Sequence, residues 1–220
     1  MQDLIQTVLI YALPVLFAIT VHEAAHGYAA RYFGDRTAEM LGRITLNPMR
    51  HIDPVGTVLM PLLLYFATSG AFLFGYAKPV PVQFGRLRNP KRDMIWVALA
   101  GPAVNLAQAV LWGVFLYVLV GTGLTERFFV EMARAGMLVN VVMFAFNLFP
   151  LPPLDGGRIL VGLLPMRWAL GLSRIEPWGF FIVMGLVIAG IVSTIWMRPV
   201  MGLTFGLIEL LLSPLAMWVK

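Results

Sequence analysis

The sequence predicts an all-α polytopic membrane protein with about five transmembrane helices, a re-entrant or hairpin element and short membrane-associated extended segments. Of its 220 residues, 60% are hydrophobic and only 12% are charged, whereas a soluble domain carries about 25% charged residues. The mean hydropathy is +0.83, and the apolar residues form runs of about 20 residues, the length that a helix needs to cross a bilayer. This composition excludes a soluble enzyme, a disordered chain and a nucleic-acid-binding domain.

Five apolar runs are long enough to be membrane-spanning helices. Polar, turn-rich segments separate most of them, and Pro14 is expected to kink the first run. A short amphipathic piece at 158–172 precedes the last two runs, which are expected to form a helix pair with tryptophans at the membrane interface. The expected spans are residues 4–32, 94–120, 128–149, 178–196 and 199–219.

A sixth apolar run, residues 55–76, is expected to enter and leave the membrane on the same side. Basic residues cluster before it, at 31–50, and after it, at 78–92. The positive-inside rule disfavours the export of either cluster. We therefore expect a re-entrant or hairpin element here, with an ordinary span as the alternative. With five full spans elsewhere, the N-terminus lies outside and Lys220 inside.

The segment PVPVQF at residues 79–84 predicts extended chain or a short strand. A residue that precedes a proline is pushed toward extended backbone. Prolines at 79 and 81 also remove two hydrogen-bond donors, which counts against a regular edge strand.

The basic net charge does not indicate a nucleic-acid partner. The chain carries a net charge of +5, but its basic residues are scattered between apolar runs, as is typical of membrane proteins. No cysteine is present, which excludes disulfides and thiolate metal sites. Any metal ion must therefore be bound by histidine, aspartate or glutamate.

One motif with metal-binding chemistry lies inside the first span. His22-Glu23-Ala24-Ala25-His26 has the pattern HExxH, and residues four apart lie on one face of a helix. Both imidazoles can reach one zinc ion, and Glu23 lies beside them to take a proton from a water that zinc activates. Ionisable residues inside a span are costly and mark functional sites, and this pair contains two of the chain's three histidines.

A catalytic zinc site usually has three protein ligands, and the third ligand has two candidates. Asp155 lies in the segment NLFPLPPLDGG at 147–157, where irregular backbone is tolerated if it lines a cavity. The alternative role for Asp155 is the N-cap of the amphipathic helix that follows. His51, in the polar loop 34–54, is the rival ligand. For His51 we expect hydrogen bonding within the loop, with support of a ligand or contact with substrate as the alternative.

Three segments, in this order, resemble the signatures of the site-2 protease family of intramembrane zinc metalloproteases. They are HEAAH at 22–26, AGPAVN at 100–105 and NLFPLPPLDGG at 147–157. The resemblance covers residues 15–158, and GRITLNPMRHIDPVGTVLMP followed by AKPVPV is similar to the compact bacterial and archaeal branch. No PDZ-like insertion or CBS domain is expected in the chain.

The resemblance implies one Zn²⁺ ion per chain, bound by His22, His26 and Asp155, with Glu23 as the general base. It thereby favours the ligand role of Asp155 over the capping role.

The resemblance also implies that Asn105 and Asn147 lie near this site. An unpaired amide in an apolar run is costly. Each amide therefore either bonds between helices or contacts the substrate or the developing oxyanion. We expect both to bind substrate, with helix–helix bonding an equal alternative for Asn105.

The resemblance further implies a single integral-membrane domain over 1–220, with a catalytic core at about 15–158 and a C-terminal helix pair at about 178–219. The implied activity is intramembrane endoproteolysis of transmembrane segments or remnant signal peptides. The expected partners are such a substrate and the lipid bilayer of a bacterial or archaeal cell membrane, with the active site nearer the cytoplasmic side. The alternatives are a relative that binds membrane segments without cutting them and a membrane metal transporter.

Overall fold

The computed structural model describes residues 2–59, 63 and 77–218, and this part of the chain is mostly helical and contains no strand. Short 3-10 turns (η1, η3) and π-helical turns (η2, η4) connect or extend the α-helices. In chain order the elements are α1 Gln2–Tyr32, α2 Thr37–Met40, η1 Pro48–Arg50, η2 Pro54–Leu59, η3 Phe84–Arg86, α4 Pro90–Gly121, α5 Arg127–Asn147, α6 Asp155–Leu163, α7 Met166–Ser173, α8 Glu176–Ile188, η4 Val192–Met197 and α9 Arg198–Trp218.

Four helices among the described residues are long and apolar enough to cross a membrane, which confirms the predicted all-α membrane fold. They contain 28, 32, 21 and 26 residues and have hydropathies between 1.6 and 1.9. A fifth span results only if α7 and α8, which are bent by 70° at a short break, are counted together. The four are Ile5–Tyr32, Pro90–Gly121, Arg127–Asn147 and Val192–Met217.

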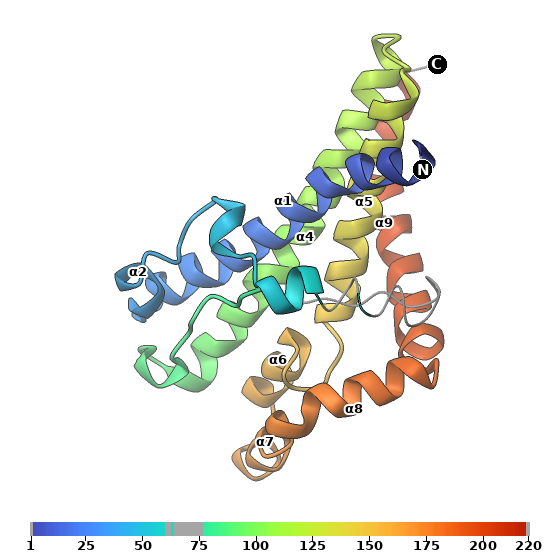
Figure 1. Ribbon diagram of the computed structural model, residues 1–220. Helices are drawn as coiled ribbons and strands as arrows, with labels where there is room; N and C mark the ends of the chain where they lie inside the picture. Colours follow the sequence, from blue (N-terminus) through green and yellow to red (C-terminus); the bar gives the residue numbers. More distant parts are fainter. Residues whose placement is uncertain (1, 60–62, 64–76, 219–220) are drawn as a thin grey trace.

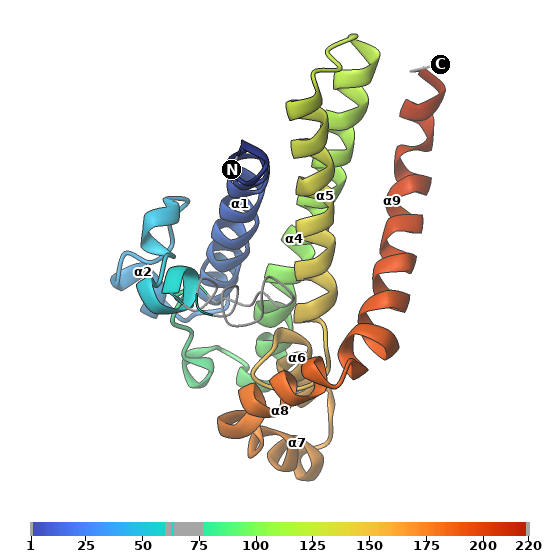
Figure 2. The same cartoon turned by 45° about the vertical axis from the view of Figure 1, so that its right-hand side comes forward.

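Helix α4 is the centre of the arrangement. It packs against α1 and α5 and also contacts α6 and α9. In Figure 1 and Figure 2, α4 and α5 form an antiparallel pair with α1 on one side and α9 on the other, and α6, α7 and α8 gather at one end. Small and branched side chains fill the seam between α4, α5 and α9: Ala109, Val141, Ile208 and Leu212.

Helix α8 differs from the predicted span at 178–196. It ends at Ile188 after 13 residues, a length of about 20 Å, whereas a hydrocarbon core is about 30 Å thick. Figure 1 shows α8 lying across the end of the bundle and not alongside α9. Gly190, with a φ of +73°, follows the helix, and the chain then continues through η4 into α9. In place of two long helices at 178–196 and 199–219, the described residues have the 13-residue α8 and one membrane-length helix, Val192–Met217.

The orientation of α8 also determines at which end of the helix bundle α9 ends. The end of α9 lies toward the end of the bundle where α1 begins (Figure 1, Figure 2). The sequence predicted that these two ends lie on opposite sides, because it counted residues 178–196 as a full crossing.

Two sequence predictions concern the region between α1 and α4. Most of the predicted hairpin at 55–76 lies outside the described residues, of which 55–59 belong to the π-helical η2 and 63 is helical. Residues 77–83 have neither helix nor strand, and Gln83 is extended with φ −102° and ψ 90°. This agrees with extended chain and not with a paired strand among the described residues.

Local signals account for the ends of the central helix. Pro90 occupies the first turn of α4, where its missing N–H costs no hydrogen bond. The backbone N–H of Asn89 donates to Asp93 Oδ2 at 2.7 Å, so the Asp93 carboxylate satisfies the N-cap residue in the manner of a capping box. Gly123, with a φ of +74°, ends the other side of the helix at a position that favours glycine.

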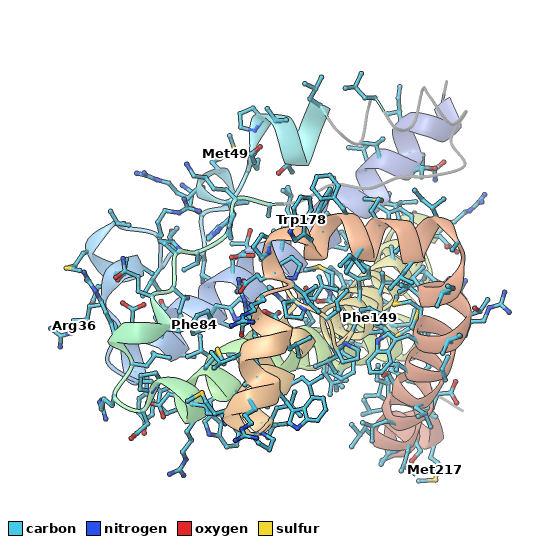
Figure 3. All side chains as sticks on the ribbon, turned by 90° about the horizontal axis from the view of Figure 1, so that it is seen from below. Arg36, Met49, Phe84, Phe149, Trp178 and Met217 are labelled. Carbon is cyan, nitrogen blue, oxygen red and sulfur yellow. The ribbon has the colours of Figure 1, made fainter. Side chains whose placement is uncertain are left out.

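Helix α8 packs closely on the proline turn that leads into α6. A Cβ atom at Gly179 would collide with the carbonyl oxygen of Pro152. Figure 3 shows this end of the molecule, with Trp178 on α8 and Phe149 in the turn after α5. The missing side chain at 179 therefore sets how near α8 lies to the turn.

Replacing Gly179 by alanine should destabilise the protein, because α8 must move away from Pro152 to make room. We expect a loss of about 1–3 kcal/mol, the usual cost of overpacking. The matched control is Gly185→Ala in the same helix, where an added Cβ meets nothing within 4 Å. The control should gain stability, by up to about 1 kcal/mol, through helix propensity. Thermal unfolding of the two variants in detergent tests this; equal melting temperatures would contradict the packing argument.

Candidate metal centre

Three side chains that can bind a metal ion converge where α1 meets the start of α6. The Nε2 atoms of His22 and His26 each lie 3.3 Å from Asp155 Oδ2 and 3.0 Å from one another. His22 and Asp155 are buried, and His26 is nearly so. Among the described residues these three form the group that can hold a metal ion, and they are the three ligands that the resemblance to the site-2 protease family implied.

The start of α6 explains why the Asp155 carboxylate is available as a ligand. Leu154 is the N-cap residue of α6, and Asp155 occupies the first helical position. The capping alternative for Asp155 is therefore wrong. Gly156 and Gly157 bring this helix start against the preceding turn, because a Cβ at either position would collide with the backbone of residues 148–152.

Hydrogen bonds on the far side of each imidazole decide which nitrogen faces Asp155. His26 Nδ1 lies 2.8 Å from the carbonyl oxygen of Val97, which can only accept, so Nδ1 carries the proton. His22 Nδ1 lies 2.6 Å from Asn105 Oδ1 and donates to it in the same way. Both Nε2 atoms are then left with a lone pair directed at the cluster, which is how second partners orient metal-binding histidines.

The geometry and electrostatics of this cluster fit a bound cation. Asp155 Oδ2 is buried and has no hydrogen-bond donor of its own. A tetrahedral ion with bonds of about 2.0–2.1 Å has ligand–ligand edges of about 3.3 Å, close to the distances found here. Burial raises the pKa of Asp155, whereas a positive charge beside the carboxylate, as on protonated His26 and His22, lowers the pKa below its usual range. With both Nε2 atoms unprotonated, a cation bound among the three ligands would supply that positive charge.

Gly101, in the AGPAVN segment, gives the two histidines their space. A Cβ at this position would collide with the rings of both His22 and His26. Helix α4 can thus pass directly behind the imidazoles. The closest neighbours of Gly101 are therefore the candidate ligands themselves.

Glu23 is held by the extended segment between η2 and α4. Its Oε2 accepts a hydrogen bond from the backbone N–H of Val80 at 2.7 Å. Val80 is buried and lies between Pro79 and Pro81, which have no N–H. Val80 is therefore the one residue of this Pro-Val-Pro triplet that can donate a backbone hydrogen bond to Glu23.

The extended segment is anchored at both ends. The buried Asp35 accepts from the N–H of Gln83 at 2.6 Å and from the N–H of Thr37 at 2.9 Å. Burial raises the pKa of Asp35, but a hydrogen bond from the Thr37 hydroxyl, together with these two backbone hydrogen bonds, outweighs it and keeps the pKa below its usual range. At the other end, Arg43 donates to the carbonyl oxygen of Lys78 at 3.0 Å. These contacts keep the Val80 amide beside Glu23.

The remaining predicted residues lie in different places. His51 is buried in its loop, with Nε2 2.9 Å from the carbonyl oxygen of Thr45, and is not part of the metal-binding group. This is the loop role expected for His51. Asn147 is half-buried at the end of α5 and donates to the carbonyl oxygen of Met143 at 3.0 Å.

Asn105 takes the structural role of its two alternatives. It is fully buried, and its amide nitrogen donates to the carbonyl oxygen of Ala18 at 3.2 Å and to Asn140 Oδ1 at 2.9 Å. Its oxygen accepts from His22. The predicted contact of Asn105 with substrate is therefore not available while these bonds are made.

Sequence reasoning missed Val80 and Asn140. The Pro-Val-Pro pattern was a usable signal, because it isolates one N–H in an extended segment. Asn140 also had a signal: it is a polar residue in an apolar helix, two turns before Asn147, and such residues bond between membrane helices.

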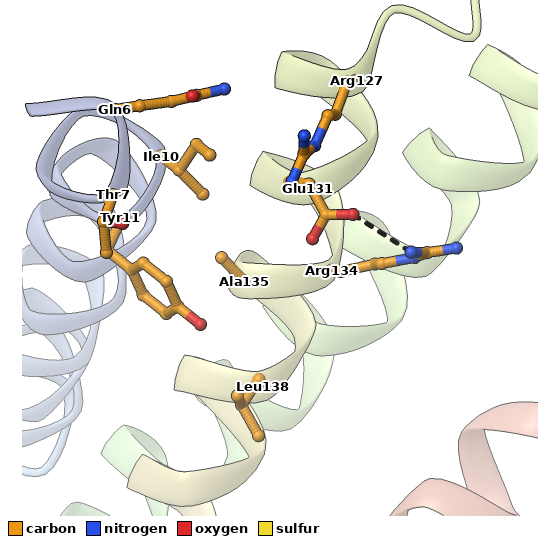
Figure 4. A pocket seen from close by; sticks show the side chains of 9 residues that line it. All are labelled: Gln6, Thr7, Ile10, Tyr11, Arg127, Glu131, Arg134, Ala135 and Leu138. Carbon is orange, nitrogen blue, oxygen red and sulfur yellow. Dashed lines mark hydrogen bonds and ion pairs between the residues drawn. The ribbon is translucent and has the colours of Figure 1, made fainter. Parts of the chain in front are cut away.

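A separate cavity of about 310 Å³ lies between the first turns of α1 and α5 (Figure 4). Its nearest α1 residue, Tyr11, is about 17 Å along the helix from His22, at 1.5 Å per residue. Glu131 and Arg134 form an ion pair of 3.1 Å at its edge. None of the candidate metal ligands lines the cavity, whose residues are Gln6, Thr7, Ile10, Tyr11, Arg127, Glu131, Arg134, Ala135 and Leu138.

The chain is similar to several curated bacterial proteins. It is 37% identical over 185 residues to YwhC of Bacillus subtilis, named as a candidate zinc metalloprotease, and the match covers 79% of this chain and 78% of that protein. It is 32% identical over 181 residues to Rip2 of Mycolicibacterium smegmatis, which bears the same kind of name, covering 79% of this chain and 64% of the relative. Rip2 of Mycobacterium tuberculosis is 33% identical over 149 residues, covering 64% of this chain and 52% of the relative. No solved structure matches the chain.

The profile of peptidase family M50 matches residues 10–138. This range contains the HExxH motif and Gly101, and it stops before Asp155, whose place in the site follows from the geometry. The match covers more than half of the chain, and the chain therefore belongs to peptidase family M50.

Proposed function

We propose that the protein is an intramembrane zinc endopeptidase. The observation that carries the proposal is the convergence of two HExxH imidazoles, on the membrane-length helix Ile5–Tyr32, and the Asp155 carboxylate, with 3.3 Å between each Nε2 and Oδ2. Membership of family M50 and the names of the relatives support zinc as the ion. When bound, zinc would supply a Lewis acid that acidifies water and polarises the scissile carbonyl.

Different residues of the chain would carry out the other steps of peptide hydrolysis. His22, His26 and Asp155 would hold the ion. Glu23, next to His22 on α1, would accept the proton of the attacking water and pass a proton to the leaving amine, as a general base and then a general acid. The Val80 amide, 2.7 Å from Glu23 Oε2, would keep one oxygen of this carboxylate in place.

The position of the site favours a substrate inside or at the edge of the membrane. His22 and His26 belong to the apolar helix Ile5–Tyr32, in its second half and before Arg31. We propose transmembrane segments or remnant signal peptides as the substrates, with Asn147 as a contact to the unwound substrate backbone. The protein would cross the membrane several times, with the site nearer the cytoplasmic side, because the basic clusters at 31–50 and 78–92 favour that side.

Glu23→Gln should abolish cleavage without removing the metal. The amide keeps the size of the side chain but cannot accept the proton, so we expect cleavage to fall by at least about 100-fold, the lower range for loss of a general base. The measurement is cleavage of a panel of single-span membrane peptides by the purified, zinc-loaded protein in proteoliposomes. Glu209→Gln on α9 is the matched control and should cleave like the wild type. Equal cleavage by Glu23→Gln and the wild type would contradict the role of Glu23; no cleavage of any peptide by the zinc-loaded wild type would instead favour a relative that binds without cutting.

Val80→Pro should slow the reaction because it removes the N–H that holds Glu23. A hydrogen bond to a charged group contributes about 1.5–3 kcal/mol, so we expect kcat to fall by about tenfold or more. Val80→Ala is the control, since it shortens the side chain but keeps the N–H. If single-turnover cleavage rates of the proline and alanine variants are the same, the backbone hydrogen bond has no part in positioning Glu23.

A further inference from the structure

We propose that Asn140 is a positioning residue that, through Asn105, fixes the orientation of His22 as a metal ligand. The inference rests on the proposed function, since it concerns the same metal centre. It concerns a residue on α5 that is none of the three candidate ligands, that hydrogen-bonds to Asn105 and to the Gly136 carbonyl, and that lies beyond the range matched by the family profile.

Three buried side chains from three helices form one continuous chain of hydrogen bonds. Asn140 on α5 donates to the carbonyl oxygen of Gly136 at 2.9 Å. Asn105 on α4 donates to Asn140 Oδ1 at 2.9 Å, and its Oδ1 lies 2.6 Å from His22 Nδ1 on α1. Asn105 and Asn140 are both 0% exposed, so water does not replace any of these contacts.

The direction of every bond in this chain is determined at its far end. The Gly136 carbonyl can only accept, so the nitrogen of the Asn140 amide must face it. The oxygen of Asn140 then faces Asn105 and requires the nitrogen of that amide. The oxygen of Asn105 is consequently turned to His22, which must donate from Nδ1.

The consequence appears at the metal centre. With its proton on Nδ1, His22 presents the Nε2 lone pair to Asp155 and the ion. If either amide were reversed, two donors or two acceptors would face each other in a buried place, which costs the desolvation of both groups. Ala18 supplies Asn105 with a second acceptor at 3.2 Å, which is longer than the bond to Asn140. Asn140 therefore reinforces an orientation that Ala18 alone holds more weakly.

The packing of α4 on α5 keeps the two amides within reach. A Cβ at Gly136 would collide with the Trp112 ring of α4, so the helices touch at the carbonyl that starts the chain. The helix pair thus holds the amides of Asn105 and Asn140 at a fixed separation, and the orientation of His22 depends on contacts made on α4 and α5.

The test is the zinc affinity of the purified full chain in detergent, measured by competition with a chromophoric zinc chelator. Removal of an outer partner of a metal ligand weakens binding by about 10–100-fold. We expect Asn140→Ala and the volume-matched Asn140→Leu to weaken zinc binding by about tenfold, at the low end of that range because Ala18 remains. Asn140→Asp should bind zinc nearly as tightly as the wild type, because burial keeps its carboxyl group protonated, so that one oxygen accepts from Asn105 and the hydroxyl donates to the Gly136 carbonyl.

Two further variants separate positioning from a general loss of structure. Thr204→Val removes another buried polar group, whose hydroxyl donates within its own helix α9 to the carbonyl oxygen of Val200, and should leave zinc affinity unchanged. In an Asn105→Ala background, Asn140→Ala should cause no additional loss, because Asn140 acts through Asn105. Wild-type affinity in Asn140→Ala, or losses that multiply in the double variant, would overturn the inference while the zinc site stands. A wild-type protein that binds no zinc would overturn the proposed function itself.

Discussion

The three candidate ligand atoms face one another inside a membrane protein, where they repel one another unless a cation lies among them. Much of the structure serves to hold them in this arrangement. Both histidines have their Nδ1 protons engaged elsewhere, so the two Nε2 lone pairs and Asp155 Oδ2 are directed at one point. Such a cluster is unfavourable when buried without a compensating charge. A cluster held in this form by several separate contacts is therefore best understood as a prepared metal site.

Glycines let helices and turns pack closely enough to bring the three ligand atoms together. Gly101 lets α4 pass behind the imidazoles, and Gly156 and Gly157 let the start of α6 fold back on its own turn. Gly179 then lets α8 lie against Pro152 in that turn. Membrane helices associate through packing of this kind, since lipid offers little hydrophobic drive between them. The same contacts that assemble the bundle thus bring Asp155, 129 positions after His26 in the sequence, to the HExxH helix.

The sequence predicts the elements whose signals are local, and it fails where tertiary contacts decide. Hydropathy was sufficient for α1, α4 and α5, and the HExxH spacing was sufficient for His22 and His26. Hydropathy could not distinguish a span from the crosswise α8, because an apolar helix that packs across a bundle end has the same composition as one that crosses the bilayer. For Asn105 the residue type indicated a buried amide but not its partners, which are 83 and 35 positions away in the sequence. The role of Asp155 could not be predicted from the local pattern, because a metal ligand and a helix cap use the same carboxylate oxygens. The structure distinguishes the two roles by placing Leu154 at the N-cap of α6.

The most direct test of this account is the number of zinc ions bound per purified chain in the wild type and in Asp155→Ala. The control is Asp93→Asn, which alters another buried carboxylate whose partner is the backbone at the start of α4. The account predicts about one zinc per chain in the wild type and in the control, with three protein ligands as in other catalytic sites, and loss of zinc in Asp155→Ala. Full zinc occupancy in a well-folded Asp155→Ala variant would contradict it, because the third ligand would then lie elsewhere.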